Sequence, residues 1–277
     1  MFSRIYVEIT NICNMNCSFC HGHSRPFKQM TTEEFEVILD KISGFTKYIY
    51  YHLMGEPLTH KKLPEFIKVA NSKGFKSMIT TNGTLLKLYG DKILDAGIHK
   101  VNISVHSFEN GTEEQFENYM TSLVDFAKKA YNKGVIVVFR LWNNGFDNGI
   151  NNKIIDYLKT NINNVWAENS KGFKLLDKMF LEFGERFSWP DINADVQGDN
   201  VFCYGLRDHI GILSDGTVVP CCLDSEGSIN LGNIFKDDLN NILNSDRAKS
   251  IKCGFDRRIA VEELCQKCGY AQRFNLK

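Results

Sequence analysis

Strand-like and helix-like runs alternate over the first 190 residues, and this alternation constrains the fold more than any other feature. The runs rich in β-branched and aromatic residues, which we expect to be strands, cover 5–12, 48–55, 77–83, 101–107, 135–143 and 179–189. The amphipathic runs between them, which we expect to be helices, cover 31–42, 62–74, 85–97, 112–134 and 150–162. Such alternation builds a parallel sheet, and six units are too few to close an eight-stranded barrel. We therefore predict an α/β fold, a partial (β/α)6 TIM-like barrel that binds ligands at the carboxyl ends of its strands.

The pattern changes after residue 190. Residues 209–220 are typical of a hairpin with an Asp-Gly turn, and short helices are expected within 237–251 and 258–268. We therefore divide the chain into a barrel, residues 1–190, and a small C-terminal α+β domain, residues 191–277.

Charge and hydropathy argue against several kinds of partner. The 33 Lys and Arg residues balance 33 Asp and Glu residues, so a polyanionic partner held by overall charge is not expected. The N-terminal segment lacks the apolar core of a signal peptide, and the longest apolar run, GVIVVF, is far too short to span a membrane. We expect a cytoplasmic protein that binds neither nucleic acid nor a membrane.

The nine cysteines are unevenly distributed. In a reducing compartment cysteines favour metal ligation or catalysis over disulfides. Cys13, Cys17 and Cys20 form a C-x3-C-x2-C pattern directly after the first expected strand, and the other six lie in the last third of the chain. Three thiolates suit zinc, completed by a nearby histidine, or an iron–sulfur cluster that leaves one iron open.

The C-x3-C-x2-C pattern after the first strand of a βα barrel resembles the radical S-adenosylmethionine (SAM) superfamily. The resemblance implies that Cys13, Cys17 and Cys20 hold a [4Fe–4S] cluster whose fourth iron binds SAM. It also implies the reductive cleavage of SAM to methionine and a 5′-deoxyadenosyl radical, which abstracts a hydrogen atom from the substrate.

The end of the second expected strand, Met54-Gly55-Glu56-Pro57, resembles the Gly-Gly-Glu motif of this superfamily, with Met54 in place of the first glycine. The resemblance implies that Gly55 and Glu56 bind the amino group of SAM, and a carboxylate is a suitable acceptor for an ammonium group. An ordinary turn at the end of a strand is the alternative.

The next three strands carry further candidates. Thr81 and Asn82 have short hydrogen-bonding side chains that suit contacts with SAM, or an Asn-Gly turn. In the superfamily a serine and a basic residue hold the SAM carboxylate, and the resemblance implies these roles for Ser104 and Arg140. A structural ion pair is the alternative for Arg140, and His106 is expected to be a hydrogen-bonded scaffold residue.

The C-terminal cysteines resemble a second motif. Cys203, Gly216 and Cys221, followed by Cys265-Gln-Lys-Cys268, resemble the SPASM/twitch extension of radical SAM enzymes. The full SPASM form has further downstream cysteines, and none follows Cys268, so we expect the shorter twitch form. The resemblance implies one auxiliary [4Fe–4S] cluster on these four cysteines, and a zinc ribbon is the alternative.

Two cysteines remain. Cys222 adjoins an expected cluster ligand, at the kind of position where certain peptide epimerases of the superfamily carry a hydrogen-atom donor, so the resemblance makes it a candidate catalytic residue. Cys253 is interpreted as a plain buried thiol.

Together these features predict a radical SAM oxidoreductase. In the family the auxiliary cluster commonly accepts the electron left by an oxidised substrate radical, so we expect a net oxidation or a crosslink. Two substrate classes fit, a small sugar or aminocyclitol and a ribosomal peptide, with a flavodoxin- or ferredoxin-type reductant. The alternatives are a peptide epimerase and a non-catalytic two-cluster electron-transfer protein, which has no need of a SAM pocket.

Overall fold

A single mixed sheet forms the centre of the protein in the computed structural model, which describes residues 1–274. Its strands are β1 (Arg4–Val7), β2 (Tyr48–Tyr50), β3 (Lys76–Thr81), β4 (Lys100–Ser104), β5 (Ile136–Asn144), β6 (Ala167–Asn169), β7 (Gly172–Leu176), β8 (Met179–Glu185), β9 (His209–Ile212) and β10 (Val218–Val219). Within the described residues their order is β10-β9-β1-β2-β3-β4-β5-β8-β7-β6. Neighbours from β1 to β5, and β5 with β8, pair in parallel. The predicted partial barrel with six parallel strands is confirmed.

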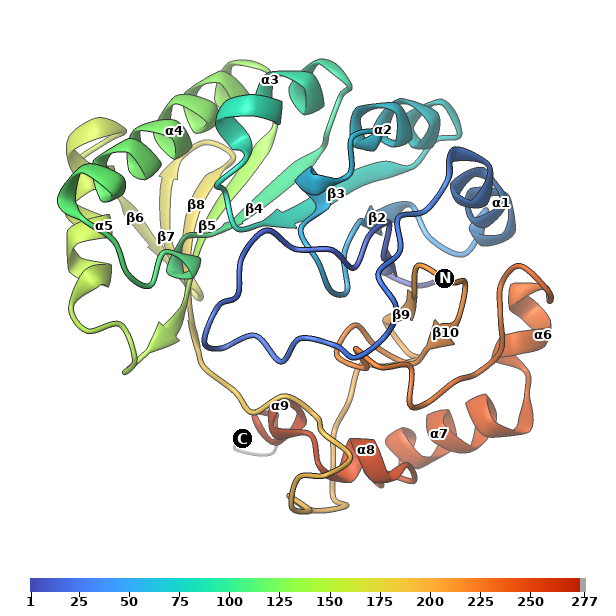
Figure 1. Ribbon diagram of the computed structural model, residues 1–277. Helices are drawn as coiled ribbons and strands as arrows, with labels where there is room; N and C mark the ends of the chain where they lie inside the picture. Colours follow the sequence, from blue (N-terminus) through green and yellow to red (C-terminus); the bar gives the residue numbers. More distant parts are fainter. Residues whose placement is uncertain (275–277) are drawn as a thin grey trace.

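Helices cover the outer side of the arc of parallel strands (Figure 1). They are α1 (Thr32–Ile42), α2 (Leu63–Ser72), α3 (Leu86–Asp95), α4 (Glu113–Asn132) and α5 (Ile150–Asn161). The side chains of Thr31 and Thr112 cap α1 and α4 in capping boxes. Between α1 and α2 the rings of Phe35 and Phe66 stack 4.5 Å apart. None of the described helices is long and apolar enough to cross a membrane.

An antiparallel hairpin, β6 and β7, precedes β8 and was not predicted from the sequence. At Gly172 the backbone has φ +148°, and a Cβ there would lie 2.4 Å from the Leu181 carbonyl oxygen. The close approach of β7 to β8 therefore requires glycine at this position.

The C-terminal region is joined to the barrel through the sheet. β9 and β10 form the predicted hairpin, with Gly216 at φ +86° in its turn. β9 also pairs in parallel with β1, so that Arg4 lies opposite His209. The C-terminal strands thus extend the barrel sheet beside its first strand, a pairing that the sequence did not predict.

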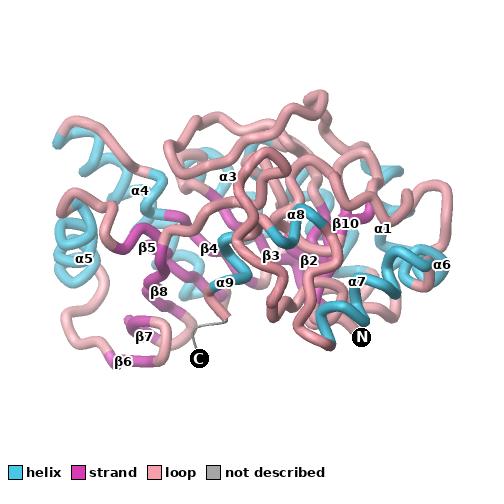
Figure 2. Tube along the Cα trace, turned by 90° about the horizontal axis from the view of Figure 1, so that it is seen from below, coloured by secondary structure: helices cyan, strands magenta, loops and turns pink. Residues whose placement is uncertain are grey.

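Short helices and loops make up the rest of the C-terminal region. The helices are α6 (Leu239–Leu243), α7 (Asp246–Asp256), α8 (Glu263–Gln266) and α9 (Gly269–Gln272). α7, α8 and α9 lie along the lower side in Figure 1, with α6 at the right, and much of this region is loop in the view from below (Figure 2). Between them and the barrel runs the segment that follows β1. We call this segment, residues 8–31, the cysteine loop, and it crosses the open side of the strand arc.

Candidate functional site

The cysteine loop places three thiols at the carboxyl end of β1. Cys13 and Cys20 are exposed, Cys17 is half-buried, and all three are free. Burial is the main reason that the pKa of the Cys17 thiol is raised to about 11, and the charges of Glu109, Cys13 and Cys20 contribute to the same rise. These thiols therefore lie within electrostatic reach of one another, as ligands of one cluster must.

Contacts with the ends of β3 and β4 hold the first half of the loop. The Asn82 side-chain amide donates to Oδ1 of Asn14 at 2.9 Å, and Asn14 donates in turn to Oγ1 of Thr84 at 2.8 Å. The backbone N–H of Ser18 donates to the Glu109 carboxylate at 2.7 Å. The predicted site residue Asn82 thus positions the loop between Cys13 and Cys17 through Asn14.

A buried carboxylate holds the second half of the loop. Glu8 is fully buried at the end of β1, and both of its oxygens pair with the Arg25 guanidinium at 2.9 and 2.7 Å. The same carboxylate accepts hydrogen bonds from the Met54 N–H at 3.1 Å and the Ser214 hydroxyl at 2.9 Å. Glu8 was not predicted as a site residue, although a glutamate within the apolar run IYVEIT was a usable signal.

The Met54-Gly55-Glu56 segment lies against the start of the cysteine loop. Gly55 has φ +77°, and a Cβ there would lie 2.5 Å from the Thr10 carbonyl oxygen. The Glu56 carboxylate is buried and accepts hydrogen bonds from the backbone N–H groups of Leu58 at 3.0 Å and Asn82 at 2.7 Å. Burial raises its pKa to about 7, against these hydrogen bonds, which lower it. Glu56 therefore ties the end of β2 to the end of β3.

Thr81 belongs to the same connection. Its hydroxyl is hydrogen-bonded to Glu56 and also accepts from the Gly83 N–H at 3.0 Å, in the turn that follows β3. The structure therefore brings Gly55, Glu56, Thr81 and Asn82 together beside the cysteine loop. Whether their side chains touch SAM stays a prediction.

Arg140 and Ser104 lie opposite each other on β5 and β4. The Arg140 guanidinium donates weakly to Oγ1 of Thr80 at 3.4 Å and lies 4.7 Å from the Trp142 ring. Its buried Nε atom has no hydrogen-bond partner among the described residues, and burial lowers its pKa. A buried donor without a partner fits an anionic ligand such as the SAM carboxylate. His106, as expected, is a scaffold residue, since its Nδ1 lies 3.0 Å from the Arg140 carbonyl oxygen.

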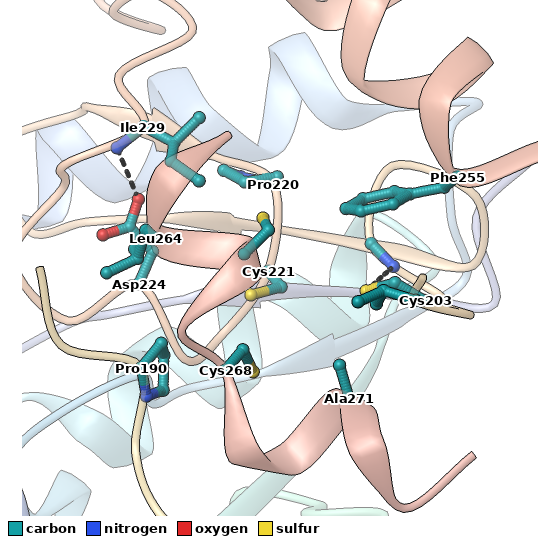
Figure 3. A pocket seen from close by; sticks show the side chains of 13 residues that line it. Pro190, Cys203, Pro220, Cys221, Asp224, Ile229, Phe255, Leu264, Cys268 and Ala271 are labelled. Carbon is teal, nitrogen blue, oxygen red and sulfur yellow. Dashed lines mark hydrogen bonds between the residues drawn. The ribbon is translucent and has the colours of Figure 1, made fainter. Parts of the chain in front are cut away.

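Four cysteines of the C-terminal region line one pocket, which we call the auxiliary pocket (Figure 3). They are Cys203, Cys221, Cys265 and Cys268. Most of the other lining side chains are apolar, and they include Phe255 and Ala271.

The chemistry of the auxiliary pocket fits a cluster. Burial raises the pKa of Cys221 and Cys265 well above that of an ordinary thiol, and the neighbouring cysteines raise it further. A Cβ on Gly205 would lie 3.0 Å from the Pro220 carbonyl oxygen, so the backbone at Gly205 packs tightly beside the auxiliary pocket. Within residues 1–274 no three His, Cys, Asp or Glu side chains converge closely enough for a single metal ion. A cubane cluster binds each thiolate to a different iron and requires no such convergence.

The two remaining cysteines lie in different surroundings. Cys222 is half-buried, packs with Leu53 and Val219, and is hydrogen-bonded to the Tyr6 hydroxyl on the inner side of β1. It therefore lies between the auxiliary pocket and the barrel interior. Cys253 is exposed on α7, so the prediction of a buried thiol was wrong. The cause is its place on the polar face of a short surface helix.

Two family models match the chain. The model of the radical SAM superfamily matches residues 7–144, and that of the SPASM iron–sulfur cluster-binding domain matches residues 203–269. This protein belongs to the radical SAM superfamily and carries a C-terminal SPASM domain.

Solved structures share the fold over nearly the whole chain. The structure of BtrN in complex with AdoMet and 2-DOIA covers 97% of this chain and 93% of that chain, with a TM-score of 0.63 and 18% identity. The match to the structure of anSMEcpe with AdoMet and the Kp18Cys peptide covers 96% of this chain and 88% of that chain, with a TM-score of 0.61 and 14% identity. At these identities the likeness shows the fold alone.

Curated relatives match a shorter region. A probable GTP 3′,8-cyclase of Methanocaldococcus jannaschii is 37% identical over 103 residues, 36% of this chain and 35% of that protein. An AdoMet-dependent heme synthase of Methanosarcina barkeri is 31% identical over 113 residues, which are 39% of this chain and 32% of that protein. The match thus spans about a third of the length of these relatives.

The protein is therefore a radical SAM enzyme, with a SAM-binding [4Fe–4S] cluster, an auxiliary cluster and SAM as its cofactors. The residues present fit these groups. The cysteine loop offers three thiols, which leaves one position for SAM, and the auxiliary pocket offers four. The unpartnered Nε of Arg140 suits the SAM carboxylate.

Proposed function

We propose that the protein is a radical SAM oxidoreductase that removes a hydrogen atom from substrate carbon and then oxidises the substrate radical. The observation that carries this proposal is the adjacency of Cys221 and Cys222. Cys221 lines the auxiliary pocket, while Cys222 contacts Tyr6 on the inner side of β1. A substrate in the barrel interior would therefore lie close to an electron acceptor.

In this proposal each part of the chain has one task. Cys13, Cys17 and Cys20 hold the cluster that, with SAM bound and one electron supplied, provides the 5′-deoxyadenosyl radical. Arg140, with Ser104 opposite it, holds the SAM carboxylate. Gly55 lets its backbone approach the cysteine loop, because any side chain there would overlap Thr10 and Asn11.

The reaction balances as a two-electron oxidation of the substrate. The substrate would give one hydrogen atom to the deoxyadenosyl group, then lose one proton to solvent or a side chain and one electron. A cluster held by Cys203, Cys221, Cys265 and Cys268 would supply the electron acceptor. The products are an oxidised or crosslinked substrate, methionine and 5′-deoxyadenosine. A flavodoxin- or ferredoxin-type protein supplies the initial electron.

Two substrate classes are compatible with this fold, a small sugar or aminocyclitol and a ribosomal peptide. The BtrN structure holds 2-DOIA and the anSMEcpe structure holds a peptide, each within a fold similar to this one. These ligands belong to those proteins, and for this chain they define the classes to be screened.

The test compares wild type with a Cys13/Cys17/Cys20→Ala variant, both reconstituted anaerobically with iron and sulfide. Wild type should bind two cubane clusters and the variant one, so iron should fall from about eight to about four atoms per chain. After addition of dithionite and SAM, we expect 5′-deoxyadenosine from wild type only. Zinc in place of iron, or no deoxyadenosine from fully loaded wild type, would overturn the proposal.

A second function is favoured by the position of Cys222, whose sulfur contacts Tyr6 inside the barrel. In a peptide epimerase this thiol would return a hydrogen atom to the substrate radical. The two functions separate in heavy water with a peptide substrate. Epimerisation places deuterium on the substrate carbon in wild type and stops in Cys222→Ala at unchanged iron content, whereas oxidation incorporates none.

A further inference from the structure

An aromatic cluster around Tyr6 lines the inner side of β1, β2 and β9. The Tyr6 ring stacks on Tyr50 with ring centroids 5.3 Å apart. His52 and His209 present their rings edge-on to Tyr6, each at 5.6 Å. We call these four residues the Tyr6 cluster. Three of them, Tyr6, His52 and His209, are partly exposed although they face inward, so solvent reaches this region.

Polar atoms beside the Tyr6 cluster lack partners. Among residues 1–274, buried side-chain nitrogens without a hydrogen-bond partner include Nε of Arg4, Nε of Arg140, Nδ1 of His52 and Nδ1 of His209. Buried polar groups in folded proteins are almost always hydrogen-bonded. Nε of Arg140 is assigned to the SAM carboxylate, so the three remaining nitrogens beside these rings, on Arg4, His52 and His209, indicate a second ligand that this region is built to hold.

The charge of the region identifies the kind of ligand. Tyr6 lies within electrostatic reach of both Arg4 and Arg140. Among the ion pairs of the described residues, neither arginine takes part in one. Tyr50 and Tyr270 interact electrostatically with both arginines. Cys222 interacts in the same way with Arg4, and Glu182 with Arg140. Arg4 is thus a guanidinium without a carboxylate, which fits an anionic ligand.

The two arginines serve different ends of the barrel interior. Arg140 lies opposite Ser104, the last residue of β4, at the end of the strands where SAM is proposed to bind. Arg4 is the first residue of β1 and lies opposite His209, the first residue of β9. Burial and the charge of Arg4 lower the pKa of His209 to about 4, so near neutral pH His209 is an uncharged hydrogen-bonding partner.

We propose that Arg4 and His209 bind an anionic group of the substrate, a carboxylate or a phosphate, beside Tyr6. This inference rests on the proposed function and adds to it the chemical class of the substrate. The anionic group is held at the amino end of β1, away from the cysteine loop. The remainder of the substrate extends along Tyr6 and His52 toward SAM.

Anion binding to the reconstituted holoenzyme tests this site without turnover. SAM is kept saturating, so that Arg140 is occupied, and no reductant is added. Inorganic phosphate and acetate are titrated separately, and binding is followed by calorimetry and by the shift in melting temperature. Phosphate binding identifies a phosphate-bearing substrate, and preferential acetate binding identifies a carboxylate.

Three variants make the result specific. Arg4→Gln removes a charged donor, and we expect anion affinity to fall at least about tenfold. His209→Asn should weaken binding as well, and it decides the question if Arg4→Gln does not fold. Arg257→Gln makes the same substitution on an exposed arginine at the end of α7 and should bind anions as wild type does. No binding by wild type, or equal binding by wild type and a folded Arg4→Gln or His209→Asn, would overturn the proposal.

The anion-binding experiment and the test of the proposed function can fail separately. Deoxyadenosine formation by reduced wild type tests the radical chemistry and needs no anion. A protein that binds phosphate through Arg4 but makes no deoxyadenosine would keep the anion site and lose the proposed function. A protein that makes deoxyadenosine but binds neither anion would keep the proposed function and lose the anion site.

Discussion

Arg25 and Glu8 form a two-pronged ion pair, with Nη1–Oε1 and Nη2–Oε2 distances of 2.9 and 2.7 Å, in which Glu8 has no solvent exposure. Arg25 also donates from Nε to the Ser225 carbonyl oxygen at 2.7 Å. The neighbouring Ser24 hydroxyl donates to the Glu226 carboxylate at 2.8 Å. One short segment thus fastens the cysteine loop both to β1 and to the C-terminal domain.

Arg25→Gln is expected to destabilise the protein strongly and to loosen the cysteine loop. Removing one partner of a buried pair leaves an uncompensated charge, which typically costs about 3–5 kcal/mol. The matched control is Lys129→Gln, which breaks an exposed pair with Asp91 and should cost less than about 1 kcal/mol. Urea unfolding and iron content measure both effects. Equal stability of the two variants would show that the Glu8–Arg25 pair contributes no more than a surface pair.

Gly55→Ala is expected to disrupt the connection between β2 and the cysteine loop. The left-handed backbone costs an alanine about 1–2 kcal/mol, and overlap with the Thr10 carbonyl adds about 1–3 kcal/mol. Gly74→Ala is the control, because Gly74 has φ +84° but no atom within 4 Å of the position that a Cβ would occupy. Gly74→Ala introduces backbone strain alone, so the difference in melting temperature between the two variants measures the effect of the overlap. A Gly74→Ala variant as unstable as Gly55→Ala would contradict the role of close approach.

Glu56 should make stability depend on pH. Its pKa in the folded protein is about 7, above the value near 4.3 expected when unfolded. The folded state therefore binds this proton more tightly, and the free energy of unfolding falls as pH rises through 7. Between about pH 6 and about pH 8.5 the loss should be on the order of 1–2 kcal/mol, and Glu56→Gln should remove it. The measurement is urea unfolding of wild type and Glu56→Gln at the two pH values. An equal change in the free energy of unfolding in the two proteins would contradict the prediction.

Cys221→Ala should remove the auxiliary cluster and leave the other cluster in place. Iron is expected to fall from about eight to about four atoms per chain, while deoxyadenosine formation without substrate continues. Cys253→Ala is the control, since Cys253 is exposed and outside the auxiliary pocket. If Cys253→Ala lost as much iron as Cys221→Ala, the assignment of ligands would need revision.

Local signals in the sequence were sufficient for most helices and barrel strands. The helices expected over 31–42 and 112–134 begin where predicted, at the capping threonines Thr31 and Thr112, because a cap depends on residues a few positions apart. The cysteine spacings likewise predicted two separate clusters of thiols. The hairpin of β6 and β7 was missed because β6 is only three exposed residues long and β7 only five residues long, too short for a periodic pattern to be recognised.

Relationships between distant residues could not be predicted. The second strand was expected to reach residue 55 but ends at Tyr50, since the following segment turns inward to meet Glu8 and the cysteine loop. The pairing of Arg4 with His209 depends on the parallel register of β1 and β9, for which neither segment carries a local signal. The Tyr6 cluster is therefore visible only in three dimensions.

The pairing of β1 with β9 also has a consequence for the order in which the protein matures. Ser3 and Asp208, which are hydrogen-bonded beside this pair, are 205 positions apart. Contacts this distant slow folding, because a long loop must close before they form. During synthesis the edge of β1 that pairs with β9 stays unpaired until β9 has been made. Ser24 and Arg25 likewise cannot form their hydrogen bonds with Glu226 and Ser225 before those residues have been made. The segment that carries the first cysteine motif is thus fastened at both ends only after residue 226 has been synthesised.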